Sequence, residues 1–132
     1  MVFTDSELSY LATQRLGRIA TQQPNGTLQV SPVGFRYNPD TETIDVYGFG
    51  MEKSRKYRNI ADNGRVAFVV DDLASTQPWR PRCVEIRGHA EATTGANGAP
   101  MIRITPERII SFGLEETNTP AHQLRTDSRK VG

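Results

Sequence analysis

The segment from Val84 to Glu91 constrains the fold most, because apolar and polar residues alternate along it. Successive side chains of a β-strand point to opposite faces of a sheet, so this alternation predicts a half-buried strand. Other extended segments are bounded by glycine, proline or asparagine turns, as a series of paired strands requires. These expected strands are residues 16–21, 27–37, 43–50, 66–70, 101–104 and 108–112.

Two short helices are expected between the strands. Thr4-Asp5-Ser6-Glu7 has the spacing of a capping box, and the apolar residues that follow predict a helix to about Thr13. Ser54 occupies the N-cap position of a second helix of about ten residues, which Gly64 ends with a left-handed cap. Residues 71–81 are expected to form a loop, and Thr105-Pro106 is expected to interrupt the last extended segment.

About six strands with two short helices predict a mainly β fold, a small antiparallel barrel. Residues 1–114 are expected to form this domain, and residues 115–132 a polar tail that is loosely ordered or lies against a partner. A subunit of 132 residues with ten aromatic side chains has a modest core. Burial between two copies would supplement that core, so a homodimer is expected.

Composition excludes several classes of protein. The longest aliphatic and aromatic run, Val66 to Val70, is far shorter than a membrane-spanning helix, and the amino-terminal residues are acidic where a secretory signal is basic. We therefore expect a cytoplasmic protein. One cysteine and two histidines exclude a disulfide scaffold and a closed zinc site. Sixteen basic and fifteen acidic residues give a net charge of +1, so the protein has no strong positive electrostatic field to attract nucleic acid.

Ser31-Pro32-Val33-Gly34 is the first candidate for a binding site. Proline removes a hydrogen-bond donor from a strand, and glycine removes a side chain, so both interrupt a regular pairing edge. A flat heteroaromatic ring could bind the freed backbone, with Gly34 permitting its close approach. The alternative is a bulge or barrel corner that only bends the sheet.

A second candidate lies where a strand ends at Phe49-Gly50-Met51 and a helix begins at Ser54-Arg55-Lys56. Residues 51–65 hold five bases and two acids, so positive charge is concentrated there. Bases in a first helical turn oppose the helix dipole unless an anion is bound, and helix N-termini bind phosphate. The alternative is a solvated basic surface whose charges pair with Glu52 or Asp62.

The two candidate sites would adjoin if residues 27–37 and 43–50 were neighbouring strands of a meander. A ring held by the first strand and a phosphate held at the end of the second could then belong to one nucleotide-like ligand. That combination indicates a flavin.

Several segments, in this order, also resemble a known family: Arg18-Ile19-Ala20-Thr21, Pro24-Asn25-Gly26, Val30-Ser31-Pro32-Val33-Gly34-Phe35, Lys53-Ser54-Arg55-Lys56-Tyr57-Arg58-Asn59-Ile60 and Arg65-Val66-Ala67-Phe68. They resemble the pyridoxamine 5'-phosphate oxidase-like split β-barrel proteins, and most of all their actinobacterial branch that uses the deazaflavin coenzyme F-420. The resemblance spans roughly residues 3–114. Its most specific parts are the Ser-Pro-Val-Gly strand and the Ser-Arg-Lys helix start.

The resemblance implies a homodimer of split barrels with two cofactor sites at the subunit interface. In each site Ser54, Arg55 and Lys56 would hold the cofactor phosphate. The remaining implied cofactor contacts are Ser31, Pro32, Val33 and Gly34 along the ring, Phe49, Gly50 and Met51 beside them, and Trp79 from the partner chain. The longer carboxyl-terminal region of true pyridoxamine phosphate oxidases is missing, which argues against vitamin B6 chemistry.

The expected function is therefore that of an oxidoreductase that transfers a hydride from reduced coenzyme F-420 to an electron-poor, small organic acceptor. No catalytic acid–base residue is expected, because the cofactor supplies the chemistry. Two alternatives remain at this point: an FMN-dependent oxidoreductase of the same fold, and a carrier that binds the cofactor without turnover.

Overall fold

The computed structural model describes residues 2–115 and 118–132. Its elements are α1 (Asp5–Ala12), β1 (Leu16–Gln22), β2 (Leu28–Gly34), β3 (Arg36–Asn38), β4 (Thr43–Val46), the 3-10 turn η1 (Met51–Lys53), α2 (Arg55–Asn63), β5 (Arg65–Thr76), β6 (Trp79–Thr94), β7 (Pro100–Phe112), the 3-10 turn η2 (Ala121–Gln123) and β8 (Asp127–Lys130). The fold is mainly β with two helices, as expected, but the described residues form eight strands rather than about six.

Both helix boundaries follow from the predicted caps. At the start of α1 the backbone N–H of Glu7 donates to Thr4 Oγ1 (3.1 Å), and the N–H of Thr4 donates to the Glu7 carboxylate (2.9 Å). Ser54 caps α2, and Gly64 ends it with a φ of 70°. The sequence predicts these ends because capping depends on residues within one helical turn.

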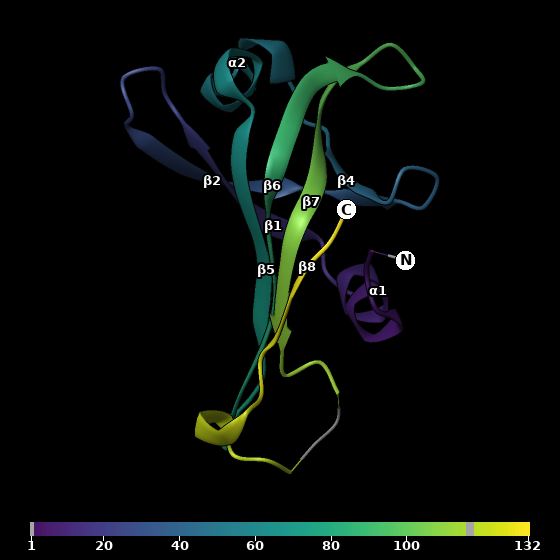
Figure 1. The fold of residues 1–132 in the computed structure, drawn as a ribbon, viewed down its shortest axis with the longest axis vertical. Helices are drawn as coiled ribbons and strands as arrows, with labels where there is room; N and C mark the ends of the chain where they lie inside the picture. The colour runs from purple at the N-terminus through teal and green to yellow at the C-terminus, as the bar shows by residue number, and fades with distance from the viewer. Residues whose placement is uncertain (1, 116–117) are drawn as a thin grey trace.

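The strand order is β2-β1-β5-β6-β7-β4-β3, with β8 paired to β7. β2 and β3 lie at opposite ends of this order although only Phe35 separates them in the chain, so the sheet has to curve until its two ends meet (Figure 1). This corrects the expected meander. Residues 27–37 are two strands, and only the short β3 pairs with β4.

A long antiparallel hairpin of β5 and β6 dominates the molecule and runs down its long axis (Figure 1). Residues 71–76 and 79–81, expected as part of a loop, extend these two strands instead. Pairs of opposite charge hold this low-hydrophobicity part of the hairpin. Asp71 pairs with Arg18 (2.6 Å), and Asp72 binds Arg82 through both carboxylate oxygens (2.8 and 2.6 Å).

β7 is continuous where Thr105-Pro106 was expected to interrupt it. The register between β6 and β7 shifts between Arg87 and Gly88, which leaves Glu107 of β7, next to the proline, without a partner in β6. A side chain at Gly88 would collide with the Thr105 carbonyl, so glycine permits this close approach. A bulge of this kind lets a strand continue past a residue that cannot donate to the ladder.

The expected loose tail is partly ordered within the same sheet. β8 pairs with β7, and Arg129 in β8 donates to the carboxylate of Glu7 in α1 (2.5 and 2.8 Å). Glu7 is fully buried and also accepts a hydrogen bond from Ser111 (2.6 Å). The carboxyl-terminal strand therefore fastens α1 to the barrel.

The core lies inside the curved sheet and is built from aliphatic side chains around Phe3 and Phe68. In β5, Val66, Phe68 and Val70 are buried, whereas Ala67 and Val69 on the opposite face are only half-buried. The sequence predicts this strand to be buried on both faces, and within one chain only the inner face is covered. In the described part of the chain, no helix is long and apolar enough to cross a membrane.

Candidate cofactor site

The amino-terminal end of α2 is the first part of the candidate site. Ser54 Oγ accepts the N–H of Tyr57 (3.2 Å) and donates to the Met51 carbonyl (2.7 Å). Ser54 thereby joins η1 to α2, and Met51 is buried beneath it. The Ser54 hydroxyl is committed to these internal bonds, so its role in this structure is to set the start of the helix.

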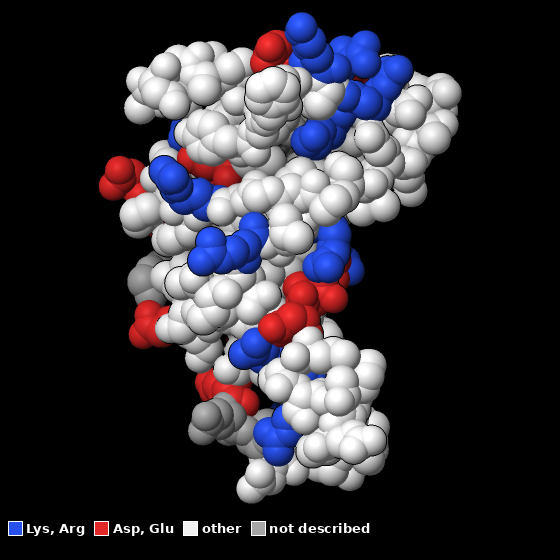
Figure 2. Space-filling view, turned by 180° about the vertical axis from the view of Figure 1, so that it is seen from behind, with Lys and Arg blue, Asp and Glu red and all other residues white. Residues whose placement is uncertain are grey.

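Four basic side chains surround this helix start: Lys53, Arg55, Lys56 and Arg58. Lys and Arg gather at the end of the molecule that carries α2 (Figure 2). None of the four forms an ion pair with a carboxylate of residues 2–115 or 118–132, so Glu52 and Asp62 do not neutralise them. Uncompensated bases beside a helix N-terminus favour binding of an anion, because the dipole and the charges both attract it.

Asn59 connects α2 to the sheet. Its side chain is 1% exposed, and its Nδ2 donates to Thr21 Oγ1 in β1 (3.0 Å) and to Gln29 Oε1 in β2 (3.3 Å). Its Oδ1 is buried and has no hydrogen-bond partner among the described residues. Buried polar atoms are normally satisfied, so an unpaired acceptor next to a candidate site fits a missing ligand or a bound water.

β2 is the second part of the site and forms the end of the strand order next to β1. Pro32 and Gly34 are exposed on it, Val33 is buried, and Ser31 Oγ is a second buried atom without a partner in the described structure. An ideal Cβ on Gly34 would meet only the Arg15 carbonyl, at 4.0 Å. Neither crowding nor a left-handed backbone therefore requires glycine at this position.

The structure joins the two parts by a different route from the one predicted. β2 is not a neighbour of β4, so the strand that leads into η1 does not lie beside Ser31 to Gly34. Instead α2 packs against β1, and Asn59 reaches across to Gln29 in β2. A strand advances about 3.4 Å per residue, which places residues 31–34 roughly 7 to 17 Å along β2 from that contact.

The remaining predicted contacts fall into two groups. Phe49, Gly50 and Met51 precede α2 directly, with Phe49 fully exposed and Gly50 at a φ of 63°. Trp79 lies at the other end of the molecule, because β5 begins right after α2 and its twelve residues span roughly 35 to 40 Å. Trp79 and the α2 of one chain therefore cannot share a ligand.

Sequence reasoning missed Thr21, Gln29 and Asn59 as residues of the site. An asparagine inside a helix is ordinarily exposed, and no local pattern shows that Asn59 faces two polar strand residues. These three residues can be recognised as a group only once β1, β2 and α2 are packed together.

The comparisons with known proteins bear on this arrangement. Residues 3–96 match the family model described as pyridoxamine 5'-phosphate oxidase. The chain belongs to this family. A protein of Streptomyces rimosus subsp. rimosus named 5a,11a-dehydrotetracycline/5a,11a-dehydrooxytetracycline reductase is 42% identical, over 92% of each chain. These matches make the chain an oxidoreductase of the pyridoxamine 5'-phosphate oxidase family.

Solved structures share the fold at low sequence identity. A FAD-binding protein from Mycobacterium smegmatis has a TM-score of 0.64 and 20% identity, covering 84% of this chain and 95% of that one. A conserved hypothetical protein from Mycobacterium tuberculosis has a TM-score of 0.68 and 17% identity, covering 92% of this chain and 96% of that one. The split-barrel fold expected from the sequence is thus confirmed.

Proposed function

We propose that this oxidoreductase binds the deazaflavin coenzyme F-420 and transfers a hydride from its reduced form to an electron-poor, small organic acceptor. The observation that carries the proposal is the start of α2, where four bases lie beside the N-terminus of a helix and form no ion pair with a carboxylate of the described residues. A phosphate group has the charge and the acceptor oxygens to fit there.

Each part of the chain has a distinct role in this proposal. Arg55 and Lys56 supply charge-assisted hydrogen bonds to the phosphate, together with the backbone N–H groups of the first helical turn. Ser54 sets the start of the helix, and Asn59 fixes α2 against β2. The ring would lie along the free edge of β2 at Pro32, Val33 and Gly34, where Gly34 has no side chain to obstruct it.

The reduced cofactor would supply a hydride to a carbon of an electron-poor double bond, and solvent would supply the proton that completes the reduction. The chain has to bind, orient and exclude water, for which it needs no acid–base pair. The relative from Streptomyces is named as a reductase, which supports reduction of an organic acceptor as the direction of the reaction.

The working form in this proposal is a cytoplasmic homodimer. Val30, Ala20 and Ala67 lie in register on adjacent strands of the outer sheet face, and Val30 is 67% exposed. A second copy on this face would cover it. Because Trp79 lies far from the α2 of its own chain, it can reach only a cofactor bound at the α2 of the partner.

Titration of the purified protein with F-420 and with FMN, followed by cofactor fluorescence, tests the proposal. We expect tight binding of F-420, and loss of at least two orders of magnitude in affinity in the double variant Arg55→Ala/Lys56→Ala, since each charge-assisted bond contributes about 1.5 to 3 kcal/mol. The control Arg55→Lys/Lys56→Arg keeps both positive charges at the start of α2 and should lose much less affinity than the double alanine variant.

The same titration separates the alternatives. Tight binding of FMN, with no binding of F-420, would show that the cofactor is FMN and would leave the proposed phosphate site at α2 unchanged. Binding of F-420 without hydride transfer to any electron-poor alkene tested would make the protein a carrier. Unchanged affinity in a folded Arg55→Ala/Lys56→Ala variant would refute the phosphate site.

A further inference from the structure

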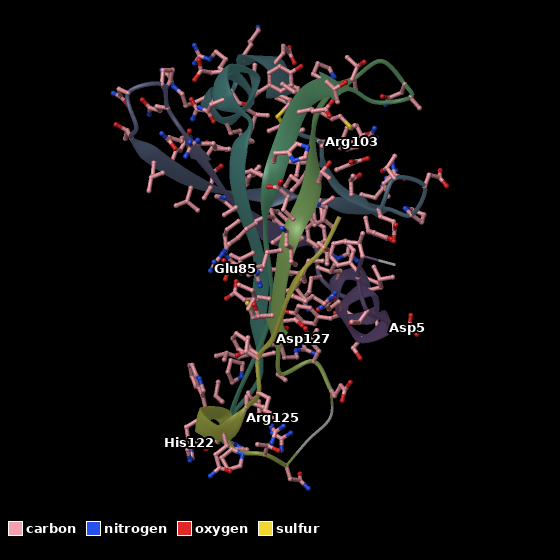
Figure 3. The ribbon with its side chains drawn as sticks, in the orientation of Figure 1. Asp5, Glu85, Arg103, His122, Arg125 and Asp127 are labelled. Carbon is pink, nitrogen blue, oxygen red and sulfur yellow. The ribbon has the colours of Figure 1, made fainter. Side chains whose placement is uncertain are left out.

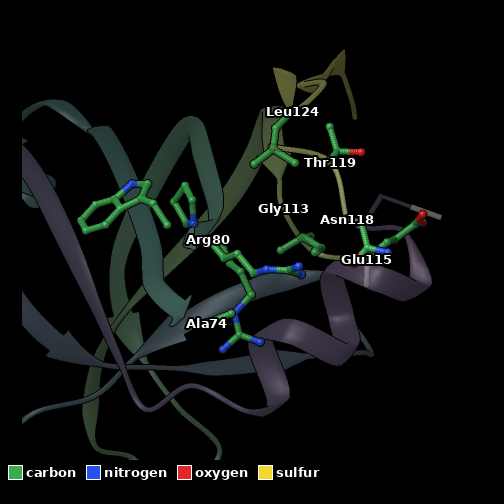
Figure 4. A pocket seen from close by; sticks show the side chains of 11 residues that line it. Ala74, Arg80, Gly113, Glu115, Asn118, Thr119 and Leu124 are labelled. Carbon is green, nitrogen blue, oxygen red and sulfur yellow. The ribbon is translucent and has the colours of Figure 1, made fainter. Parts of the chain in front are cut away.

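A cavity of about 540 Å³ lies at the end of the molecule opposite α2. It separates the tip of the β5–β6 hairpin from the carboxyl-terminal segment, which carries His122 and Arg125 at that end (Figure 3). Ala74 and Arg80 on the hairpin face Thr119 and Leu124 across it (Figure 4). The volume falls within the range of about 300 to 1,000 Å³ that is typical of small-molecule sites.

An irregularity in β5 contributes to this cavity. The register between β5 and β6 shifts between Leu73 and Ser75, which leaves Ala74 as the unpaired residue. Ala74 lines the cavity, whereas its neighbour Leu73 does not. A bulge redirects a side chain and is common next to functional sites, and here the redirected side chain is small.

One part of the cavity wall is a flat apolar surface. Trp79 is 56% exposed, and Pro81, Leu114 and Leu124 add apolar surface beside it. An aromatic face exposed in a concavity is suited to stacking on a flat ring. These residues favour contact with a planar ring, and the polar side chains of Glu115 and Asn118 in the same lining favour a ligand that also bears polar groups.

Arg82 supplies the polar part of the wall. Its Nε and Nη2 donate to Asp72 (2.8 and 2.6 Å), and its guanidinium lies 5.0 Å from the centre of the Tyr10 ring. Tyr10 in turn donates its hydroxyl to Asp72 (3.0 Å). The guanidinium is thereby held in place while its Nη1 has no hydrogen bond to the described residues, so it can donate to a ligand oxygen.

We propose that this cavity binds the organic substrate, and that the substrate is a flat polycyclic compound bearing carbonyl or enol oxygens. This assignment rests on the proposed reductase function. In it, the rings stack on Trp79 and an oxygen accepts from Arg82. The cavity is remote from the α2 of its own chain, so the substrate meets the cofactor bound by the partner subunit.

Trp79 is the only tryptophan in the sequence, so its fluorescence reports on the cavity directly. The probe is anthraquinone-2-sulfonate, added to protein without cofactor, and the matched probe is anthracene-2-sulfonate, which has the same flat ring system without carbonyl oxygens. We expect saturable quenching by both, with anthraquinone-2-sulfonate bound at least tenfold more tightly. Equal affinities would overturn the recognition of a ligand oxygen by Arg82.

Two neighbouring substitutions locate the binding. Ala74→Phe fills the cavity and should weaken binding of anthraquinone-2-sulfonate at least tenfold, whereas Leu73→Phe places the same side chain outside it and should bind as the wild type does. Absence of saturable quenching, or equal affinity in the folded Ala74→Phe variant, would overturn the assignment.

The titration of F-420 against the α2 variants is read from cofactor fluorescence and tests the charges at α2, whereas the cavity assignment is read from Trp79 quenching in protein without cofactor. Failure of the cavity assignment is therefore distinguishable from failure of the proposed cofactor site. If anthraquinone-2-sulfonate does not quench Trp79 while F-420 binds normally, the cavity assignment is wrong and the proposed cofactor site is unaffected.

Discussion

Glu7 shows how much of the fold can depend on one side chain. Burial by itself raises the pKa of a carboxyl group, but the hydrogen bonds from Arg129 and Ser111 outweigh burial here and hold the pKa of Glu7 below its usual value. The charged form is therefore the one that stabilises the fold. A proton would have to displace hydrogen bonds that connect α1, β7 and β8.

The pKa shift predicts the acid response. A carboxyl group whose pKa is lower in the folded state stabilises the protein above its unfolded pKa, and that stabilisation is lost as the pH falls through the folded pKa. Glu7→Gln should lower the free energy of unfolding at neutral pH by about 3 kcal/mol and should flatten its decline below pH 5, measured by urea unfolding at several pH values.

Asp127→Asn is the matched control for that change. It removes the other carboxylate partner of Arg129, which lies at the surface and should contribute less than about 1 kcal/mol. Equal losses in the two variants would contradict a special role for the buried pair.

Gly34 gives the second prediction at the scale of the residue. Because an added Cβ meets nothing closer than 4.0 Å, Gly34→Val should leave the melting temperature close to that of the wild type. The larger side chain should nevertheless obstruct the ring and weaken binding of F-420. A lowered melting temperature with native affinity would make Gly34 purely architectural.

Gly17→Ala serves as the comparison for Gly34→Val. A Cβ at Gly17 would collide with the ring of Phe68 in the core, so this variant should lose stability by about 1 to 3 kcal/mol. Melting temperature and cofactor affinity, measured on both variants, separate the two effects.

At the scale of the element, Asn59 holds helix α2 against strands β1 and β2. Replacing it with leucine leaves Thr21 and Gln29 without their shared donor, and an unsatisfied buried group costs about 1 to 3 kcal/mol. If that contact aligns α2 with β2, then Asn59→Leu should weaken binding of F-420 by more than tenfold while binding of inorganic phosphate changes little.

A control for Asn59→Leu is available in the turn between β6 and β7. Asn97→Ala removes an exposed asparagine whose side chain accepts the N–H of Ala99 within the same turn, so it should leave cofactor affinity unchanged. Equal loss of F-420 and phosphate binding in folded Asn59→Leu protein would show that α2 itself, and not its alignment with β2, had changed.

At the scale of the whole molecule, the distance between α2 and the hairpin tip leads to a test of assembly. If the cofactor of one chain meets the substrate cavity of its partner, a hybrid of an Arg55→Ala/Lys56→Ala chain and an Ala74→Phe chain has one site made of two intact halves. Such a hybrid, isolated with two affinity tags, should regain about half the activity of the wild-type dimer although each variant alone is inactive.

If the purified hybrid regains no activity, the cofactor site and the substrate cavity that work together belong to the same chain. Analytical ultracentrifugation of the wild type adds an independent check, because the covered face should exceed about 1,000 Å² and hold the dimer at micromolar concentration. A monomer that binds cofactor fully would contradict the shared site.

Features that depend on residues close together in the chain were predictable from the sequence. The caps at Thr4, Ser54 and Gly64, the turns and the alternation around Val84 all act within a few residues, and the structure confirms them. The basic start of α2 was predictable for the same reason. Its bases lie close together in the chain, from Lys53 in η1 to Arg58 in α2, so their charge adds up whatever surrounds them.

The tertiary structure decided what depends on partners distant in the sequence. Local patterns do not specify which strands become neighbours, so the sequence placed 27–37 beside 43–50 where the sheet separates β2 from β4. Polar stretches such as 71–76 and 127–130 look like loop and tail because their stabilising partners, Arg18, Arg82 and Glu7, lie between 10 and 122 residues away. An ion pair across strands exists only once the chain has brought both charges together, and no pattern along the sequence contains that information.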